Sequence, residues 1–375
     1  MATKRLVLIG GGHAHMVTLA NLNTFVRKGY DVTVIQPSEY HYYSGMGPGM
    51  LGKTYSADDI RFATRKVVEK QGGTFVLGKA SVIDTEKQLV RLADSDLSVP
   101  FDVVSCNAGS YVPTSIVSEI NHPDIFTVKP IESLLEAQQR ILELSEKKSI
   151  DIAVVGGGPS SVEIGGNSWR LCRESRVNPP RIKIFAGRKL LSRVPEKIGE
   201  MARESLRKRG IDVLENTHVD RIEPGKIITK SGETHPADII FTAVGVKPST
   251  LFAASGLPTG PDGGLRVNRY LQSVTHHNIF GGGDCIYFEK EPLDKVGVYA
   301  VRENPILYHN LMASLEGGSL QAFDPGGSYL LIYNLGDDTG IFCKWSFIFS
   351  GSLAFRIKDY IDRKFMVRFQ AMEQQ

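Results

Sequence analysis

One local pattern occurs twice in the sequence, and it constrains the fold more than any other feature. The apolar run Arg5–Ile9 leads into three glycines at 10–12, and the run Ile150–Val155 leads into three glycines at 156–158. Helix-spaced apolar residues and a second apolar run follow in both places. A continuous apolar run that ends at glycines is typical of a buried parallel strand. The chain therefore predicts two βαβ units, which is an α/β fold with two Rossmann-like domains.

The composition of the 375-residue chain excludes several classes of protein. With 42% hydrophobic and 23% charged residues, it lies near the globular average and far from a disordered or fibrous chain. Its 44 basic and 41 acidic residues leave a net charge of +3, so we expect no nucleic acid among its partners. The four cysteines lack metal-ligand spacing, so we expect no metal site and a reducing compartment.

The two ends of the sequence bear on localisation. The N-terminus enters its first apolar run directly, without the apolar segment and cleavage site of a signal peptide. The longest uncharged stretch near the C-terminus, Trp345–Phe355, is about half of the roughly 20 residues that a membrane-spanning helix needs. We therefore expect a cytoplasmic chain that does not cross a membrane.

The spacing of apolar residues along the chain predicts the other helices and strands. Helix-spaced apolar residues and alternating apolar runs distinguish helices from strands. The pattern predicts helices over 13–26, 58–71, 131–148, 299–315 and 352–369, and strands over 31–35, 101–108, 181–185, 238–243, 278–280 and 329–333.

The first glycine motif, Gly10-x-Gly12-x-x-His15, predicts a turn that binds a dinucleotide. The first glycine permits a tight turn, the second lets the backbone approach a pyrophosphate, and the helix that follows supplies free N–H groups. His15 stands where Gly or Ala is usual, and Gln36 stands where an acid usually binds the ribose. A glycine turn without a ligand is the alternative, and the strand and helix on either side argue against it.

The second motif, Gly156-x-Gly158-x-x-Ser161, predicts a second dinucleotide. Its second strand is followed by Arg188 and Lys189, where an acid would bind the ribose of NAD. An arginine at this place accommodates the 2′-phosphate of NADP. Solvated cations are the alternative, so the sequence leaves NADH and NADPH both open.

Four segments follow one another along the chain: GGGHAH (10–15), VVGGGPSSVEIGG (154–166), FTAVGVKPS (241–249) and IFGGGDC (279–285). In this order they resemble the two-dinucleotide-binding-domain flavoproteins, also called the pyridine nucleotide-disulfide oxidoreductase superfamily. Three further segments are HYYSGMGPGMLGKTYSADDI (41–60), KVGVYAVRENPILYHNL (295–311) and KDYIDRKFM (358–366). With them the chain is most similar to the NADH-dehydrogenase-like branch, which includes type II NADH dehydrogenases and sulfide:quinone oxidoreductases, and locally to the flavoprotein module fused to selenide water dikinase.

The resemblance implies an NAD(P)H-binding domain inserted into a discontinuous FAD-binding domain. The FAD domain is expected over 1–120 and 248–320, and the NAD(P)H domain over 121–247. A short C-terminal element, 321–375, is expected to face the electron acceptor, a membrane or a dimer partner.

The resemblance also implies which residues bind the nucleotides. Glu163 is the candidate catalytic residue, which would position the nicotinamide and tune proton traffic. The residues expected to bind FAD are Gly10, Gly12, Ala14 and His15 at the pyrophosphate, Gln36 at the ribose, Ala80 near the adenine, Gly109 near the flavin, Gly283 and Asp284 at the ribitol, and Lys295 and Val296 before a helix that points at the flavin. Those expected to bind NAD(P)H are Gly156, Gly158, Ser160, Glu163, Arg188 and Gly245.

The implied function is an FAD-dependent NAD(P)H dehydrogenase, in which hydride passes from NADH or NADPH to the flavin and electrons leave to a small-molecule acceptor. A quinone is one candidate acceptor, although Gly297 and Val298 replace the Ala-Gln quinone motif of type II NADH dehydrogenases. A sulfide:quinone-type enzyme is an alternative, with Cys172 and Cys343 as its only available cysteine pair; small buried side chains are the simpler role for both. A non-enzymatic redox-responsive flavoprotein is the other alternative.

Two further groups of residues admit more than one role. His13, His15, His41 and Tyr43 fall in the first FAD half, where each could donate a proton near the flavin or pack around the phosphate loop; packing is favoured for His13.

Apolar residues at i, i+4 steps and an excess of basic residues indicate an amphipathic helix within 341–369. Such a helix docks on an anionic membrane surface, here the inner face, or packs on protein. Peripheral membrane contact and a homodimer therefore both stay open. The apolar stripe is Leu353, Ile357, Ile361 and Phe365.

Overall fold

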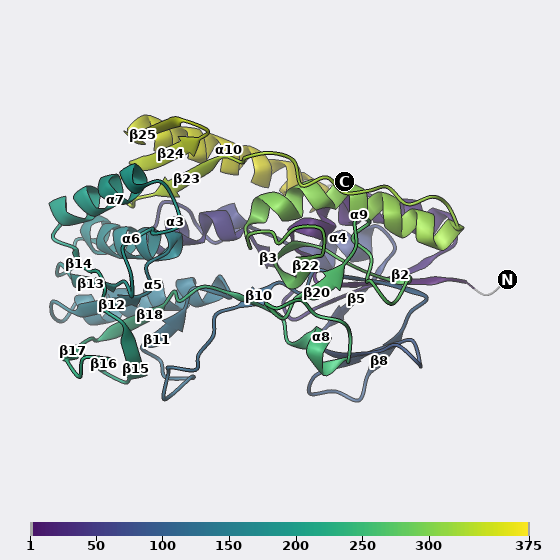
Figure 1. Ribbon diagram of the computed structural model, residues 1–375, viewed down its shortest axis with the longest axis horizontal. Coiled ribbons are helices and arrows are strands. Elements are labelled where there is room, and N and C mark those ends of the chain that lie inside the picture. The colour runs from purple at the N-terminus through teal and green to yellow at the C-terminus, as the bar shows by residue number, and fades with distance from the viewer. Residues whose placement is uncertain (1–2, 374–375) are drawn as a thin grey trace.

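Two parallel five-stranded sheets, one for each repeat, form the centre of the computed structural model, which describes residues 3–373 (Figure 1). The strand before each glycine turn lies in the middle of its sheet and is buried, as its apolar run predicts. The first sheet has the order β21 (Ile279–Gly281), β9 (Val103–Cys106), β1 (Arg5–Ile9), β2 (Asp31–Gln36) and β5 (Thr74–Leu77), and the second has the order β11 (Ile125–Thr127), β18 (Ile239–Thr242), β12 (Asp151–Val155), β13 (Arg181–Phe185) and β14 (Asp212–Leu214). The predicted α/β fold with two Rossmann-like units is confirmed.

Helices and small sheets complete both units; the pair of β20 and β22 is parallel, and the other small sheets are antiparallel. The helices are α1 (Met16–Ala20), α2 (Leu22–Arg27), α3 (Gly47–Leu51), α4 (Thr64–Lys70), α5 (Glu132–Ser145), α6 (Pro159–Ser175), α7 (Glu196–Lys208), α8 (Leu251–Ala254), α9 (Gly297–Glu316) and α10 (Ser352–Gln370). The small sheets are β6 (Ala80–Asp84) with β7 (Leu89–Leu92) and β8 (Ser98–Pro100), β15 (Val219–Glu223) with β16 (Lys226–Thr229) and β17 (Thr234–Pro236), β20 (Leu265–Val267) with β22 (Ile286–Phe288), and β3 (His41–Tyr42) with β4 (Arg61–Phe62).

The chain passes from the first unit to the second and back through two short strands, β10 (Ser110–Tyr111) and β19 (Lys247–Pro248). They pair antiparallel, with Ser110 opposite Pro248, between the two large sheets (Figure 1). The second sheet is therefore built entirely from chain that lies between these two strands.

Two predicted helices are wrong in part. The helix predicted over 13–26 is a 3-10 turn followed by α1 and α2, which meet at Asn21. The Asn21 side chain donates a hydrogen bond to the Val17 carbonyl, and such local bonding competes with helix continuation. The helix predicted over 58–71 begins only at Thr64, because the two residues of β4 pair with β3 instead.

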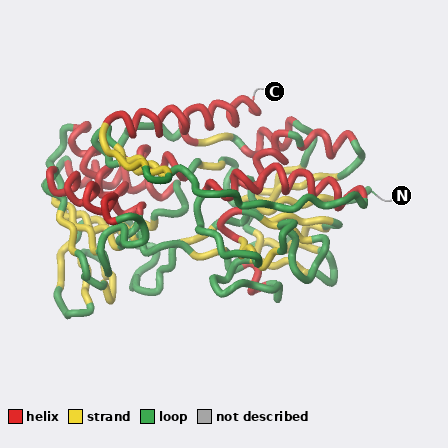
Figure 2. The backbone as a smooth tube through the Cα atoms, turned by 45° about the horizontal axis from the view of Figure 1, so that its top comes forward, coloured by secondary structure: helices red, strands yellow, loops and turns green. Residues whose placement is uncertain are grey.

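The C-terminal element lies across both units on one side of the molecule (Figures 1 and 2). It is a three-stranded sheet of β23 (Leu331–Asn334), β24 (Gly340–Lys344) and β25 (Phe347–Gly351), followed by α10. Strand β23 contacts α6 of the second unit, and α10 contacts β4 of the first unit. Side chains of α3 and of the C-terminal element share one apolar core with the second unit. This shared core fixes the two units relative to each other.

The buried face of α10 differs from the predicted apolar stripe. Leu353 and Ile361 of that stripe are 60% and 41% exposed, whereas Lys358 and Asp362 are buried. Phe365 of the stripe packs against the apolar core, but the periodicity of apolar residues alone does not identify the buried face of this helix.

Candidate functional site

A cavity of about 620 Å³ lies between the two units and reaches the C-terminal element. Its size is within the range of small-molecule and cofactor sites. The first unit contributes the glycine turn after β1 and the loop after β9, the second unit contributes the start of α6, and the C-terminal element contributes β23 and Lys358 of α10. One cavity thus meets both predicted nucleotide motifs and the element after them.

The glycine turn after β1 is held against the end of β9. Gly10 has a φ of +86°, and a Cβ atom there would overlap the carbonyl oxygen of Asn107. A Cβ atom at Gly12 would overlap the Asn107 side-chain oxygen. Only glycine fits at both positions, and the turn presents its backbone to the cavity. This is the cradle that a pyrophosphate requires.

His15 supports this turn from behind. Its Nδ1 lies 2.6 Å from the Gly10 carbonyl oxygen, and its Nε2 lies 2.8 Å from Ser105 Oγ. Complete burial lowers the pKa of His15 to about 4, so its ring is neutral near pH 7. His15 and the neighbouring Ala14 are buried and do not line the cavity. The histidine therefore ties β1 to β9 under the turn.

Gln36, at the end of β2, uses most of its hydrogen-bonding capacity within the protein. Its Oε1 accepts from the Gly11 N–H at 2.9 Å, and its Nε2 donates to the carbonyls of Ser38 and Tyr40 at 2.7 and 2.8 Å. Both amide hydrogens are engaged, so Gln36 can only accept from a ribose hydroxyl, through Oε1. It lines the cavity beside the glycine turn.

Asp284 belongs to a three-residue network that the sequence did not predict. Lys129 Nζ lies 2.7 Å from Asp284 Oδ2 and 2.9 Å from Ser110 Oγ, and the Ser110 hydroxyl donates to the same carboxylate at 2.7 Å. Burial alone would raise the pKa of Asp284, but the Lys129 ammonium and these hydrogen bonds hold it below its ordinary value. Lys129 follows β11, and ligands bind outside the carboxyl ends of parallel strands. That position is the signal that could have identified it.

Glu163, on α6, faces the C-terminal element. Its Oε1 accepts from the Asn334 N–H of β23 at 2.9 Å. Burial raises the pKa of Glu163, and nearby Lys358 and the Asn334 hydrogen bond offset this only in part. The carboxyl group therefore retains a proton at a higher pH than an exposed glutamate.

A buried ion pair lies beside Glu163, and the sequence did not predict it. Lys358 Nζ lies 2.5 Å from Asp362 Oδ2 and donates to the Gly45 carbonyl at 2.8 Å. The Tyr43 hydroxyl donates to Asp362 Oδ1 at 3.0 Å. Burial raises the pKa of Asp362, despite the opposing effect of Lys358. Lys358 lines the cavity, so the pair joins α10 to the loop after β3 at its wall.

Three side chains that line the cavity each have a buried polar atom without a hydrogen-bond partner among residues 3–373. These atoms are His13 Nε2, His41 Nε2 and the Tyr333 hydroxyl. Burial lowers the pKa of His13 to about 4 and of His41 to about 3, so both rings are neutral near pH 7. His13 also stacks on Phe365 of α10, which agrees with the packing role favoured for it. Buried polar atoms normally have partners, so a polar ligand fits this cavity.

The structure brings many of the predicted site residues together and leaves others apart. Arg188 is exposed after β13. Those that line the cavity are Gly10, Gly12, Gln36, Ala80, Gly109, Ser160, Glu163, Gly283, Asp284, Lys295 and Val296. Those outside its lining are Ala14, His15, Gly156, Gly158, Arg188 and Gly245.

The cysteines give no support to a sulfide-type site. Cys106, Cys172 and Cys285 are buried, and Cys172 Sγ contacts Ser145 Oγ at 3.7 Å. Burial raises the pKa of Cys172 and of Cys343, which disfavours the reactive thiolate. None of the four lines the cavity.

The fold and the cavity are those of a two-nucleotide flavoprotein, because each Rossmann-like unit has a glycine-rich turn of the kind that binds a dinucleotide. Residues 4–312 match the model of the pyridine nucleotide-disulphide oxidoreductase family, and the chain belongs to that family. It is therefore an oxidoreductase that uses FAD, with NADH or NADPH as co-substrate. The glycine cradle and the unpartnered polar atoms of the cavity fit a dinucleotide cofactor of this kind.

Known proteins are similar over nearly the whole chain. Ferroptosis suppressor protein 1 of Xenopus laevis is 24% identical, with 90% of this chain and 87% of that protein covered. The type II NADH:quinone oxidoreductase of Staphylococcus epidermidis is 24% identical, with 96% and 94% covered. The structure of NDH2 from Plasmodium falciparum in complex with NADH superposes with a TM-score of 0.83 at 16% identity, with 100% and 98% covered.

Removing the charge of Lys129 tests its role at Asp284. In the wild type, the depressed pKa of Asp284 contributes stability above its ordinary value of 3.8, and this is lost as the pH falls through the native pKa. In Lys129→Met the buried carboxylate loses its paired cation and keeps only the weaker influence of Lys295, so we expect a loss of about 1–3 kcal/mol in the free energy of unfolding at pH 7. The loss narrows as the pH falls through the native pKa of Asp284, which lies below 3.8, because Asp284 is then protonated in both proteins. Urea denaturation over this pH range measures it.

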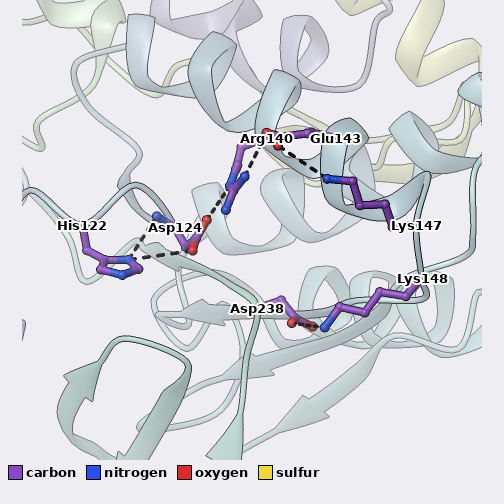
Figure 3. A network of polar contacts seen from close by, with 7 residues as sticks. All are labelled: His122, Asp124, Arg140, Glu143, Lys147, Lys148 and Asp238. Carbon is purple, nitrogen blue, oxygen red and sulfur yellow. Dashed lines mark hydrogen bonds and ion pairs between the residues drawn. The ribbon is translucent and has the colours of Figure 1, made fainter.

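Lys148→Met is the matched control. Lys148 pairs with Asp238 at 2.6 Å on the surface of the second unit, and its side chain is 60% exposed (Figure 3). An exposed pair contributes about 0–1 kcal/mol, so the control loses little stability. Equal losses in the two variants at pH 7 would refute the role given to Lys129.

Proposed function

We propose that the protein is an FAD-dependent NAD(P)H dehydrogenase that passes its electrons to a quinone. The quinone would bind at the end of the cavity that the C-terminal element lines. The observation that carries the proposal is the single cavity that meets the start of α6, the glycine turn after β1 and the C-terminal element. The quinone named for the Staphylococcus epidermidis relative supports this choice of acceptor. The apolar side chains of Leu331 and Ile332 in the cavity wall suit an apolar ring.

The proposal keeps the domain division expected from the sequence. Residues 1–120 and 248–320 bind FAD, residues 121–247 bind NAD(P)H, and 321–375 covers the acceptor end. When bound, FAD supplies the chemistry that accepts a hydride from the nicotinamide and releases electrons to the acceptor. The protein residues bind, orient and supply protons.

Two helix N-termini face the cavity and complement negative charge. Pro159 and Ser160 begin α6, a helix of 17 residues, and Gly158 before them has open space where a side chain would lie. Val296 and Gly297 begin α9, a helix of 20 residues. Unpaired N–H groups and the helix dipole stabilise phosphates or a developing negative charge at such ends.

Glu163 holds and transfers a proton in this proposal. It lies in the cavity wall beside Lys358 and is shielded from bulk water. Reduction of a quinone to a quinol takes up two electrons and two protons. Because its pKa is raised, Glu163 keeps its proton to a higher pH than an exposed glutamate and is better suited to donate one of these protons.

Glu163→Gln tests the proposal, because glutamine keeps the shape and the acceptor for Asn334 but cannot transfer a proton. With NADH or NADPH and a short-chain quinone, we expect the purified wild-type protein to turn over, and kcat to fall on the order of 100-fold in the variant. FAD content should not change. Glu143→Gln on the exposed face of α5 is the matched control (Figure 3). If Glu163→Gln has the same turnover rate and the same substrate affinities as the wild type, Glu163 does not transfer the proton.

We also propose that the C-terminal element contacts a membrane surface peripherally. Among residues 3–373, no helix has the length and apolar character needed to cross a bilayer. Cations surround the exposed apolar side chains of β24, β25 and α10, as expected for contact with anionic lipid. The apolar side chains, with their exposures, are Trp345 (68%), Phe347 (69%), Leu353 (60%), Tyr360 (65%), Ile361 (41%) and Val367 (65%), and the cations are Lys344, Arg356, Arg363, Lys364 and Arg368.

Co-sedimentation with vesicles of phosphatidylglycerol and phosphatidylcholine tests this contact. We expect the wild-type protein to bind, and the double variant Trp345→Ser, Phe347→Ser to lose at least about tenfold in affinity, because it lacks two exposed aromatic side chains that lipid contact would bury. Leu97→Ser, at an exposed apolar residue of the first unit, is the matched control. If the wild type does not bind and elutes as a dimer while the double variant elutes as a monomer, the surface is a dimer contact instead.

A further inference from the structure

The Tyr333 hydroxyl is a buried donor that the protein itself leaves unused. Tyr333 lies on β23, is 3% exposed and lines the cavity, and its hydroxyl has no hydrogen-bond partner in the described part of the chain. Its backbone is fixed by the pairing of Tyr333 with Ile341 in the C-terminal sheet. Buried tyrosine hydroxyls normally find a partner. The side chain is therefore held in place with its polar end available to a molecule in the cavity.

Glu163 acts on Tyr333 electrostatically, and Glu163 and the polar groups near it make hydrogen bonds of their own. Glu163 Oε1 accepts from the Asn334 N–H, Lys358 Nζ is shared by Gly45 and Asp362, and the Tyr43 hydroxyl donates to Asp362. Burial, with the nearby Cys343 and Glu163, raises the pKa of Tyr333, so its hydroxyl stays protonated and acts as a donor. Among these described neighbours, the Tyr333 hydroxyl is the donor without a partner.

The wall around this donor is apolar on one side. Leu331 and Ile332 of β23 line the cavity next to Tyr333, and Pro48 of α3 lines it as well. Apolar side chains around one donor favour a flat apolar molecule with an oxygen acceptor on its edge. This is the chemistry of a quinone, with its ring and its carbonyl oxygen.

We propose that Tyr333 donates a hydrogen bond to a carbonyl oxygen of the acceptor quinone and thereby sets acceptor affinity. This inference rests on the proposed function and adds a residue to it. The hydrogen bond holds the carbonyl at the same wall as Glu163 and Lys358, where a proton can be supplied. Tyr333 comes from the C-terminal element, so that element contributes directly to the acceptor site.

Tyr333→Phe removes only the hydroxyl. We expect KM for a water-soluble ubiquinone analogue to rise about 3- to 10-fold, as one neutral hydrogen bond is lost. Flavin reduction by NAD(P)H, FAD affinity and the visible flavin spectrum should not change, and neither should turnover with ferricyanide, which has no carbonyl. Tyr30→Phe, outside the cavity lining, is the activity control.

Stability supplies a second signature. Without quinone, the melting temperature should stay the same or rise in Tyr333→Phe, because the Tyr333 hydroxyl then has no hydrogen-bond partner to lose. It should fall in Tyr43→Phe, which removes a hydrogen bond to the buried Asp362. The same chemical change thus has opposite consequences at the two tyrosines. A fall of equal size in both variants would mean that the Tyr333 hydroxyl is structural, and would overturn the proposal.

The kinetic results separate this inference from the proposed function. A wild-type protein that reduces ferricyanide but no quinone contradicts the proposed function. A wild type that reduces quinone with the same KM as Tyr333→Phe contradicts the inference alone. A change in FAD affinity or spectrum, with an unchanged quinone KM, would assign the hydroxyl to the flavin and also overturn it.

Discussion

The structure depends on one steric constraint that occurs twice, the absence of a side chain where a central strand ends. A Cβ atom at Gly10 would overlap the Asn107 carbonyl oxygen, and a Cβ atom at Gly156 would overlap that of Ala243. In each unit the turn after the central strand therefore lies directly against the end of the neighbouring strand. This close approach turns the chain into its helix and leaves backbone N–H groups facing outward. The cavity lies where the first of these turns meets the second unit.

The C-terminal element lines one end of the cavity with polar as well as apolar side chains. A buried ion pair often stabilises a protein no more than apolar residues of the same volume would. The Lys358–Asp362 pair, with Tyr43 and Glu163 nearby, is therefore hard to explain by stability alone. Its place in the wall of the cavity agrees with a role in proton supply at the acceptor end.

The sequence predicted the parts of the fold that local pattern determines. Both βαβ repeats, the strand Arg5–Ile9 and the strand Arg181–Phe185 follow from apolar runs that end at turn residues. The pairing of β3 with β4 was missed because it joins segments distant in sequence. The buried face of α10 was missed because it carries Lys358 and Asp362, and a pattern of apolar residues cannot identify a buried ion pair.

The candidate site divides in the same way. The glycines, Asp284 and Glu163 are in sequence motifs, and most of them line the cavity. Lys129 and Tyr333 are in no motif and reach the cavity only through the strand order and the C-terminal sheet. The role of His15 is visible only in the structure, because both hydrogen bonds of its ring are made behind the turn.

Anaerobic absorbance of the purified holoprotein tests most directly whether one cavity links a nicotinamide to an acceptor. NADH and NADPH would be added to separate samples until the visible flavin band bleaches, and a short-chain quinone would then be added. We expect at least one nucleotide to bleach the bound flavin in its first turnover. Addition of quinone should then restore the absorbance of the flavin band fully. A bound flavin that neither nucleotide bleaches would contradict the proposed dehydrogenase. Bleaching that quinone does not reverse would contradict the proposed acceptor.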